Sequence, residues 1–209
     1  MKTKRKAIVK RKTKETDIII SLNIDGSGKS KIYYPIPFLG HMFTLIAKHG
    51  IFDLELKAKG DIEVDLHHLV EDTGLALGEA FAKALKNKLK LERYGHAIIP
   101  MDESLAEVRT AVDISGRPHL TFNVNFKKEL VYAISNKNIY QLYLDKEMLK
   151  EFFESFVNKS KISLHIDLIR GKNTHHKIEA IFKGFGVALS RACKINPRKK
   201  GVPSTKGVL

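Results

Sequence analysis

The pattern His-His-x-x-Glu occurs twice in this chain, at residues 67–71 and again at residues 175–179. A further possible metal ligand precedes each copy at a similar distance, since His41 lies 26 residues before the first copy and Glu151 lies 24 residues before the second. Such a repeated order predicts a fold made of two related halves. Each half would leave one apolar sheet face and one apolar helix stripe exposed, so the halves must cover one another.

The spacing within each copy suits binding of two different metal ions. Neighbouring residues on a helix diverge by about 100°, so the two histidines of a copy point in different directions. The glutamate, three and four residues further on, lies near both imidazoles. Together the two copies, His41 and Glu151 offer eight nitrogen or oxygen ligands. The candidate set is His41, His67, His68, Glu71, Glu151, His175, His176 and Glu179.

A set of imidazoles and carboxylates without cysteine suits Mn²⁺, Fe²⁺, Zn²⁺ or Ni²⁺, and this chemistry leaves the choice of metal open. A single His-His pair is more often an ordinary surface or core pair than a metal site. Here five of the nine histidines belong to the two copies or are His41. This concentration favours metal binding.

The 209 residues can form one large domain or two closely packed halves. The single cysteine, Cys193, rules out an internal disulfide framework, is most simply a small core residue, and indicates a reducing compartment, so we expect a cytoplasmic protein. No apolar run approaches the roughly 20 residues of a membrane span. We therefore expect no membrane partner.

The formal net charge is +14, and eight of the first fourteen residues are Lys or Arg. This segment lacks the apolar stretch of a secretory signal, so it is interpreted as a basic arm leading into the first strand. The charge is compatible with nucleic-acid binding or with attraction of a small anion such as a phosphate ester. Its lysines are scattered rather than interleaved with aromatic residues, which favours the small anion.

Hydrophobic periodicity predicts the same order of strands and helices in both halves. The first half is predicted to contain a strand at 16–25, a hairpin partner at 29–34, a helix at 38–48, a strand at 52–58, a short strand around 62–64 and a helix from 67 to about 89. The second half is predicted to contain strands at 105–114 and 120–126, a helix at 145–157, a strand at 162–166 and a helix at 175–195. The predicted division is therefore a first half at 1–95, a second half at 96–195 and a basic C-terminal tail at 196–209.

The tail admits two interpretations. Its composition is typical of a disordered basic segment. It also holds hydroxyls, glycines and lysine in Pro203-Ser204-Thr205-Lys206-Gly207, which are groups that bind a phosphate monoester. The second interpretation requires the tail to fold over a site.

Motifs along nearly the whole chain resemble the imidazoleglycerol-phosphate dehydratase family of histidine biosynthesis. The resemblance covers both ligand motifs and the closing tail. Other segments that carry it are 11–18, 23–28, 38–42, 49–54, 59–61, 71–74, 93–95, 100–103, 113–118 and 173–179.

The resemblance implies an α+β fold of internally duplicated halves, with helices packed on two four-stranded sheets, of the ribosomal protein S5 domain 2-like class. It further implies a homo-oligomeric, octahedral shell of 24 subunits with two Mn²⁺ ions per active site at subunit interfaces. The implied enzyme is a hydro-lyase that removes water from imidazole glycerol phosphate to give imidazole acetol phosphate. The proton lost is not next to a carbonyl, so the metals would hold the substrate's ring as an imidazolate electron sink.

The resemblance also assigns roles residue by residue. Glu15 and His49 match positions near the reacting carbons, and Glu15 is the leading candidate for proton transfer. Substrate binding is assigned to Glu15, Arg93, Arg117, Ser204, Thr205 and Lys206, of which the cations suit a phosphate dianion.

The chain departs from the family pattern at several positions near the metal ligands. Glu151 stands where a ligand histidine is usual, and Gly40 and Leu66 replace aspartates that precede ligand histidines. Leu45 stands where a glutamine is common, and the strand between Asp102 and Asp113 is two residues longer than usual. Glu151 keeps an oxygen ligand and favours harder metal ions. The aspartates missing at 40 and 66 remove groups expected to orient ligand imidazoles.

Three hypotheses follow. The first is an active dimanganese dehydratase. The second is a diverged paralogue that keeps the metals and the shell without catalysis, and the third is a basic nucleic-acid-binding protein. The intact ligand motifs and tail favour the first.

Overall fold

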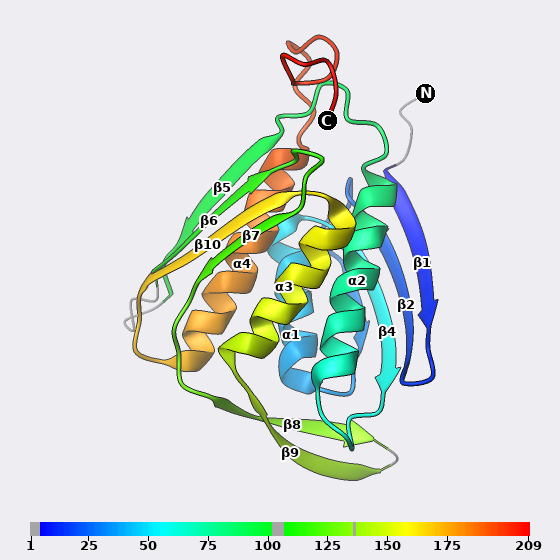
Figure 1. Ribbon diagram of the computed structural model, residues 1–209, viewed down its shortest axis with the longest axis vertical. Coiled ribbons are helices and arrows are strands. Elements are labelled where there is room, and N and C mark those ends of the chain that lie inside the picture. The colour runs from blue at the N-terminus through cyan, green and yellow to red at the C-terminus, as the bar shows by residue number, and fades with distance from the viewer. Residues whose placement is uncertain (1–4, 102–106, 136) are drawn as a thin grey trace.

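The computed structural model describes residues 5–101, 107–135 and 137–209. Four helices lie between two four-stranded sheets, which confirms the predicted α+β architecture (Figure 1). The helices are α1 (Pro37–Gly50), α2 (His67–Ala84), α3 (Lys146–Ser160) and α4 (Thr174–Cys193).

The two sheets have the same topology. The first has the order β1-β2-β4-β3, formed by Lys6–Lys12, Thr16–Asn23, Asp53–Gly60 and Ser30–Tyr33. The second has the order β5-β6-β10-β7, formed by Tyr94–Ile99, Glu107–Asp113, Ser163–Arg170 and His119–Asn123. In each sheet one edge strand pairs in parallel, β3 with β4 and β7 with β10, and the other pairs are antiparallel. This correspondence confirms the internal duplication.

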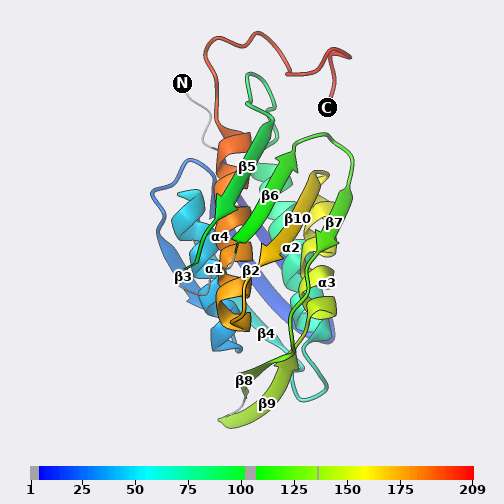
Figure 2. The same ribbon diagram turned by 90° about the vertical axis from the view of Figure 1, so that its left-hand side faces the viewer.

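The helices pack across the repeat rather than within it. Helix α2 packs on α3, and α1 packs on α4, so each helix pair contains one helix from each half. Figure 2 shows the second sheet facing the viewer with the helices behind it. The shared core includes a cluster of phenylalanine rings from both halves: Phe43, Phe152, Phe153, Phe182 and Phe185. Each half therefore completes the core of the other.

Local sequence explains the elements that periodicity predicted well. In β2, every second residue from Thr16 to Leu22 is buried, as alternation requires of a strand with one face on the core. Helix α3 begins at Asp145, whose side chain accepts a hydrogen bond from the Met148 backbone N–H at 3.0 Å. An aspartate in this position satisfies an N–H that has no partner within the helix.

Four predictions for the first half are wrong. The basic arm is strand β1, which pairs with β2 and presents most of its charged side chains to solvent, as edge strands often do. Residues 29–34 are not the hairpin partner of β2, because β3 pairs in parallel with β4. The stretch 62–64 is a turn, and α2 ends at Ala84 rather than near 89.

The parallel placement of β3 depends on Asp53 at the start of β4. Its carboxylate accepts hydrogen bonds from the backbone N–H groups of Ser27 and Lys29, at 2.8 and 3.2 Å. These bonds hold the loop after β2 against the start of β4. The chain then leaves this loop beside β4 instead of returning along β2.

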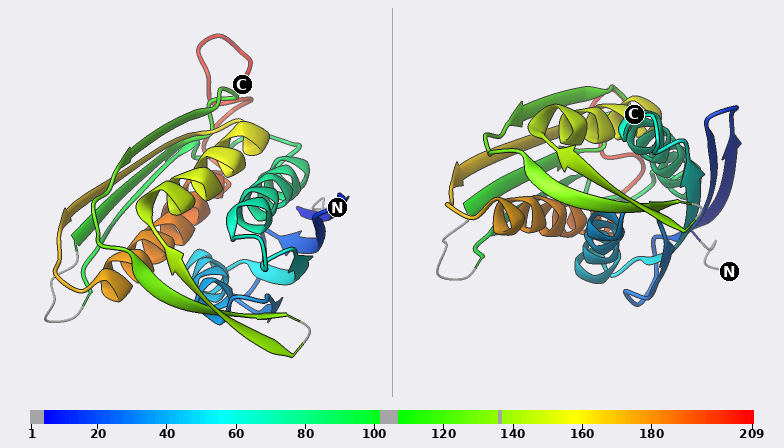
Figure 3. Two further views of the ribbon diagram at one scale, coloured as in Figure 1. Left: turned by 60° about the horizontal axis from the view of Figure 1, so that its bottom comes forward. Right: turned by 90° about the horizontal axis from the view of Figure 1, so that it is seen from below.

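The second half contains a hairpin that was not predicted, formed by β8 (Glu129–Ser135) and β9 (Asn138–Leu144). It occupies the connection between β7 and α3, whereas only residues 34–36 connect β3 and α1 in the first half. Seen from below in Figure 3, the hairpin crosses near the starts of the helices. The remaining predicted elements of this half are present, although residues 105–106 of the first predicted strand lie outside the described residues. Strand β5 was also missed, and the predicted division at 95/96 falls within it.

The tail lies at the end of the molecule where α2 and α4 terminate (Figure 1). The Lys90 N–H donates to the Gly201 carbonyl at 2.8 Å, and the Lys199 ammonium lies 2.7 Å from a Glu92 carboxylate oxygen. The tail is therefore fastened to the connection between α2 and β5. Within the described part of the chain, no helix combines the length and apolar character needed to cross a membrane.

Candidate metal centre

Both ligand motifs lie at the starts of helices. In α2 the rings of His67 and His68 are 6.1 Å apart with an interplanar angle of 79°, and in α4 the rings of His175 and His176 are 6.0 Å apart at the same angle. The two copies thus repeat the divergent arrangement that was expected from helical geometry.

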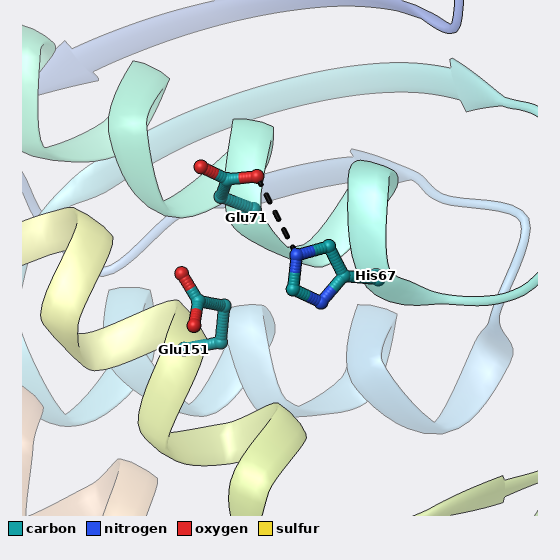
Figure 4. Close-up of side chains that lie close together, drawn as sticks. All are labelled: His67, Glu71 and Glu151. Carbon is teal, nitrogen blue, oxygen red and sulfur yellow. Dashed lines mark ion pairs between the residues drawn. The ribbon is translucent and has the colours of Figure 1, made fainter.

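The first cluster consists of His67 and Glu71 of α2 with Glu151 of α3. One ligand atom from each of these side chains lies within 4.8 Å of the others. His67 Nε2 is 3.7 Å from Glu71 Oε2. Figure 4 shows the Glu151 side chain approaching this pair from the neighbouring helix. Among the described residues, these three side chains form a group whose ligand atoms are close enough together to hold one cation.

Close packing of α2 on α3 makes this convergence possible. A Cβ on Gly74 would lie 2.5 Å from the Phe152 carbonyl oxygen, and a Cβ on Gly78 would lie 2.4 Å from that of Phe156. These glycines lie one and two turns beyond Glu71. Their missing side chains let the two helix backbones approach, and the approach carries Glu151 to the ligand motif.

The second cluster is the counterpart in the other helix pair. His41 of α1 and His175 of α4 place their Nε2 atoms 3.1 and 3.0 Å from the same oxygen, Oε1 of Glu179. The other Glu179 oxygen lies 2.7 Å from the Lys183 ammonium. Burial raises the pKa of Glu179, but Lys183, His41 and His175 together outweigh it and lower the pKa to about 2. This carboxylate is therefore ionised and able to bind a cation.

Lys183 was not among the predicted site residues, although its position four residues after Glu179 on one helix face could have indicated it. Its charge also acts on His49. Burial is the largest cause that lowers the His49 pKa, and Lys183 lowers it further. The predicted catalytic His49 thus lies in the electrostatic range of the second cluster.

Glu15 belongs to the turn between β1 and β2 and lies near His68. His68 Nδ1 is 3.0 Å from Asp61 Oδ2, and this hydrogen bond is the largest cause that raises the His68 pKa; the charge of Glu15 contributes in the same direction. Asp72 fixes the turn, since its carboxylate accepts hydrogen bonds from Arg11 Nε and Thr16 Oγ1. Asp61 and Asp72 were both missed by the sequence analysis.

The predicted phosphate-binding residues lie at the opposite end of the molecule. Arg93 donates to the Asp113 carboxylate at 2.7 Å and to the Pro203 carbonyl at 2.9 Å, and its backbone N–H donates to Ala192 near the end of α4. Ala192 and His175 are separated by 17 residues of one helix, which is about 25 Å. One chain therefore does not bring Arg93 to its own metal clusters.

The other predicted phosphate-binding groups accompany Arg93. Gly116, next to Arg117, lies against Leu209 at the end of the tail. Arg117 is exposed, as are Thr205 and Lys206, while the Ser204 hydroxyl accepts a hydrogen bond from the Lys206 N–H at 3.2 Å. Two chemically distinct ends result. One carries imidazoles and carboxylates, and the other carries exposed cations and a hydroxyl.

The three apolar departures from the family pattern are buried. Leu66 is 2% exposed and Leu45 is 8% exposed, so both belong to the core. At Gly40 an added Cβ would make ordinary contacts, 3.5 Å from the Tyr34 Cβ. The fold therefore has room for a side chain at residue 40, whereas a carboxylate replacing Leu66 would have to enter the apolar interior.

The two clusters contain only nitrogen and oxygen donors, and Glu151 fills its place with a carboxylate that reaches the ligand motif. This donor set fits hard or borderline divalent ions such as Mn²⁺. The structure brings six of the predicted ligands together in two groups, which are His67, Glu71 and Glu151, and His41, His175 and Glu179. His68 Nδ1 instead lies 3.0 Å from Asp61 Oδ2.

Comparisons with known proteins give the same family as the sequence motifs. The family model described as imidazoleglycerol-phosphate dehydratase matches residues 35–189. The chain is 46% identical over 210 residues to the imidazoleglycerol-phosphate dehydratase of Herminiimonas arsenicoxydans, covering all of both chains. It is 47% identical over 206 residues to that of Chromobacterium violaceum, covering 98% of each chain.

Solved structures agree. The Pyrococcus furiosus enzyme, crystallised in complex with a ligand, superposes with a TM-score of 0.77 at 37% identity, covering 96% of this chain and 100% of the other. The imidazoleglycerol-phosphate dehydratase of Staphylococcus aureus superposes with a TM-score of 0.75 at 38% identity, covering 91% and 99%. The chain belongs to the imidazoleglycerol-phosphate dehydratase family and is a hydro-lyase of histidine biosynthesis.

Proposed function

We propose that this protein removes water from imidazole glycerol phosphate to give imidazole acetol phosphate, using two Mn²⁺ ions per active site. The observation that carries the proposal is the pair of matching ligand clusters, each built from a His-His-x-x-Glu helix and a ligand from the other repeat. Two Mn²⁺ ions, when bound, would withdraw electrons from the substrate's imidazole ring and make it an electron sink.

The chain's own residues would divide the remaining work. The clusters hold the imidazole end of the substrate, with Glu71, Glu151 and Glu179 supplying negative charge to the cations. Glu15, beside His68, would move the proton of the reacting carbon, and His49 would contact the departing hydroxyl. At the other end of the substrate, Arg93, Arg117, Ser204, Thr205 and Lys206 would bind the phosphate dianion.

This division requires more than one chain per site. The metal end and the phosphate end of one chain are about 25 Å apart along α4, which is longer than a substrate of this size can span. A neighbouring copy would therefore supply the phosphate-binding groups. We propose a homo-oligomer with sites at subunit interfaces, an octahedral shell of 24 chains, in the cytoplasm.

A turnover assay tests the proposal. Purified protein loaded with Mn²⁺ should convert imidazole glycerol phosphate to imidazole acetol phosphate, detected by mass spectrometry, and chelation should abolish the reaction. No product from a fully metallated assembly would refute the catalytic proposal. A mass measurement before and after complete metal removal would show whether the metals also hold neighbouring chains together.

The alternative is a diverged, non-catalytic metal-binding paralogue, favoured by Gly40, Leu45, Leu66 and Glu151. It predicts no turnover in the native chain and activity after Glu151→His and Gly40→Asp are combined. A Cβ at residue 40 makes ordinary contacts, so Gly40→Asp begins without a backbone clash. Leu66→Asp is left out of this test, because Leu66 is buried in the core and the substitution would destabilise the fold.

A further inference from the structure

We propose that Asp61 is a positioning residue that orients His68 for metal binding and joins it to the Glu15 turn. This proposal rests on the proposed function, because it assumes that His68 is a metal ligand. Asp61 itself would touch neither metal nor substrate.

The geometry of the pair fixes which ring nitrogen is available. The Asp61 carboxylate can only accept, so the 3.0 Å contact with Oδ2 requires His68 Nδ1 to carry a hydrogen and donate it. The neutral ring then has its lone pair on Nε2. Nε2 is therefore the ring nitrogen that remains free of Asp61 and able to bind a cation.

Asp61 is held in place by its own backbone. Its N–H donates to the Glu15 carbonyl at 3.2 Å, and its carbonyl accepts from the Val64 N–H at 2.8 Å. The first bond joins Asp61 to the turn between β1 and β2, and the second lies within the turn that follows β4, so the Asp61 backbone is fixed before α2 begins. Because these two hydrogen bonds fix the backbone of Asp61, its carboxylate can fix the orientation of the His68 imidazole.

The surroundings of the Asp61 carboxylate support its role in orienting His68. Its Oδ1 atom is buried and has no hydrogen-bond partner among the described residues, so His68 is the principal partner of this carboxylate there. Metal binding at Nε2 draws electrons from the ring and strengthens donation from Nδ1–H. The bond to Asp61 would therefore be strongest in the metal-bound protein.

Asp61 provides the carboxylate beside His68, and the position directly before the two histidines provides none. The residue directly before the two histidines is Leu66, which is buried and apolar and cannot orient an imidazole. Asp61 supplies a carboxylate from a position seven residues before His68. Because Asp61 contacts the Glu15 backbone as well as His68, it fixes the position of the proton-transfer candidate Glu15 relative to the His68 imidazole.

Two substitutions and a control test this proposal. Asp61→Ala removes the acceptor, Asp61→Asn keeps an acceptor oxygen without the charge, and Glu63→Ala removes an exposed carboxylate from the same turn. Mn²⁺ binding is measured by titration calorimetry on the full-length protein. We expect Asp61→Ala to weaken one class of Mn²⁺ site by about 10–100-fold, Asp61→Asn to have a smaller effect, and Glu63→Ala to have none.

Nitrogen-15 NMR of the metal-free protein gives a second readout. In the unsubstituted protein the His68 signals should show hydrogen on Nδ1, and Asp61→Ala should shift the ring toward the other tautomer. A merely structural role would lower the melting temperature without changing the tautomer or the affinity of the folded protein. If Asp61→Ala does not fold, the Mn²⁺ affinity of Asp61→Asn is measured in its place, and a smaller loss of affinity is expected because the amide oxygen still accepts from His68.

Unchanged Mn²⁺ affinity and an unchanged tautomer in folded Asp61→Ala would overturn the proposal, as would unchanged Mn²⁺ affinity in Asp61→Asn where Asp61→Ala does not fold. Both readouts are independent of turnover. A protein that binds Mn²⁺ through an oriented His68 but makes no product would refute the proposed reaction and leave the role of Asp61 supported.

Discussion

At the residue scale, the two clusters differ in one ligand. The first has one imidazole and two carboxylates, with Glu151 in the place that corresponds to His41. The second has two imidazoles around one carboxylate, and Lys183 adds a positive charge. The clusters therefore differ in net charge, and the first should hold a hard divalent ion more strongly than an otherwise identical cluster with histidine.

Glu151→Gln should weaken Mn²⁺ binding at the first cluster, because the amide oxygen carries no charge. Glu151→His should retain binding but move the preference toward Zn²⁺, since imidazole suits softer ions. Competition titrations of Mn²⁺ and Zn²⁺ on both variants measure the change. Glu154→Gln, one turn further along α3, serves as the control. An unchanged Mn²⁺ affinity in Glu151→Gln would show that Glu151 is not a ligand.

Glu179 should make the metal-free protein sensitive to acid. Its folded pKa is about 2, below the ordinary value of 4.5, so its interactions stabilise the fold fully above pH 4.5 and are lost as the pH falls toward 2. Urea unfolding at pH 5 and pH 3 measures this loss. In Glu179→Gln the stability difference between the two pH values should be smaller. An equal difference in both proteins would contradict the assigned role.

The sequence predicted the candidate ligands that the structure brings together, but not the residues that contact them. The ligands recur within one motif, so their pattern is visible along the chain. Asp61 reaches His68 through a turn, and Asp72 reaches Arg11 from 61 residues away. Such contacts depend on the folded path of the chain. Lys183 is the exception, because helical spacing alone could have indicated it.

At the scale of elements, the site depends on how closely the helices approach. In the α2–α3 pair, Gly74 and Gly78 face Phe152 and Phe156 in the same order along both helices, so the helices run in the same direction. In the α1–α4 pair, Gly186 lies against the Ile46 carbonyl, 2.8 Å from an added Cβ. Both clusters thus lie at the starts of parallel, glycine-spaced helix pairs.

Gly78→Ala should destabilise the fold, because its Cβ would lie 2.4 Å from a carbonyl oxygen and would force α2 away from α3. We expect a loss of about 1–3 kcal/mol, as is typical of overpacking. Gly40→Ala is the matched control in α1, where the added Cβ has room and alanine favours the helix by about 1 kcal/mol. Chemical denaturation compares the two. Equal stability changes would contradict the close-packing explanation.

Periodicity predicted the elements that have one face on the core, and it failed where pairing decides the structure. The sequence predicts an arm in place of strand β1, because the charged residues of this segment mask a weak alternation. The parallel pairing of β3 depends on contacts with Asp53, and no local signal distinguishes it from a hairpin. The β8–β9 hairpin has no counterpart in the first half, so the internal repeat could not predict it.

At the scale of the whole molecule, the candidate ligands and the candidate phosphate-binding groups occupy opposite ends. The starts of α2 and α4 carry the ligand motifs, and the ends of these helices lie beside the tail. The sequence predicted the candidate ligands and the candidate phosphate-binding residues. It could not predict that they lie at opposite ends of the molecule, because the order of residues does not show which helix ends lie together. This placement is the main physical reason to expect sites shared between copies.

Mixing two inactive variants tests the shared site. His67→Ala impairs the metal end and Lys206→Ala impairs the phosphate end, so each pure assembly should be inactive or nearly so. Subunits mixed after chelation and reassembled with Mn²⁺ should recover about a quarter of the activity, because random mixing pairs intact ends at that frequency. Reassembled pure variants are the controls. No recovery in the mixture would indicate that both ends of each site come from the same chain.

The pairing of helices across the repeat also bears on how such a chain could have arisen. Each ligand cluster takes its motif from one half and its third ligand from the other, and each half covers the other's core. A half-length ancestor with this architecture would have lacked both a complete core and a complete cluster. Two identical copies would have supplied both. The present fold has the form of a homodimer joined into one chain, and its two candidate metal clusters differ at Glu151 and His41.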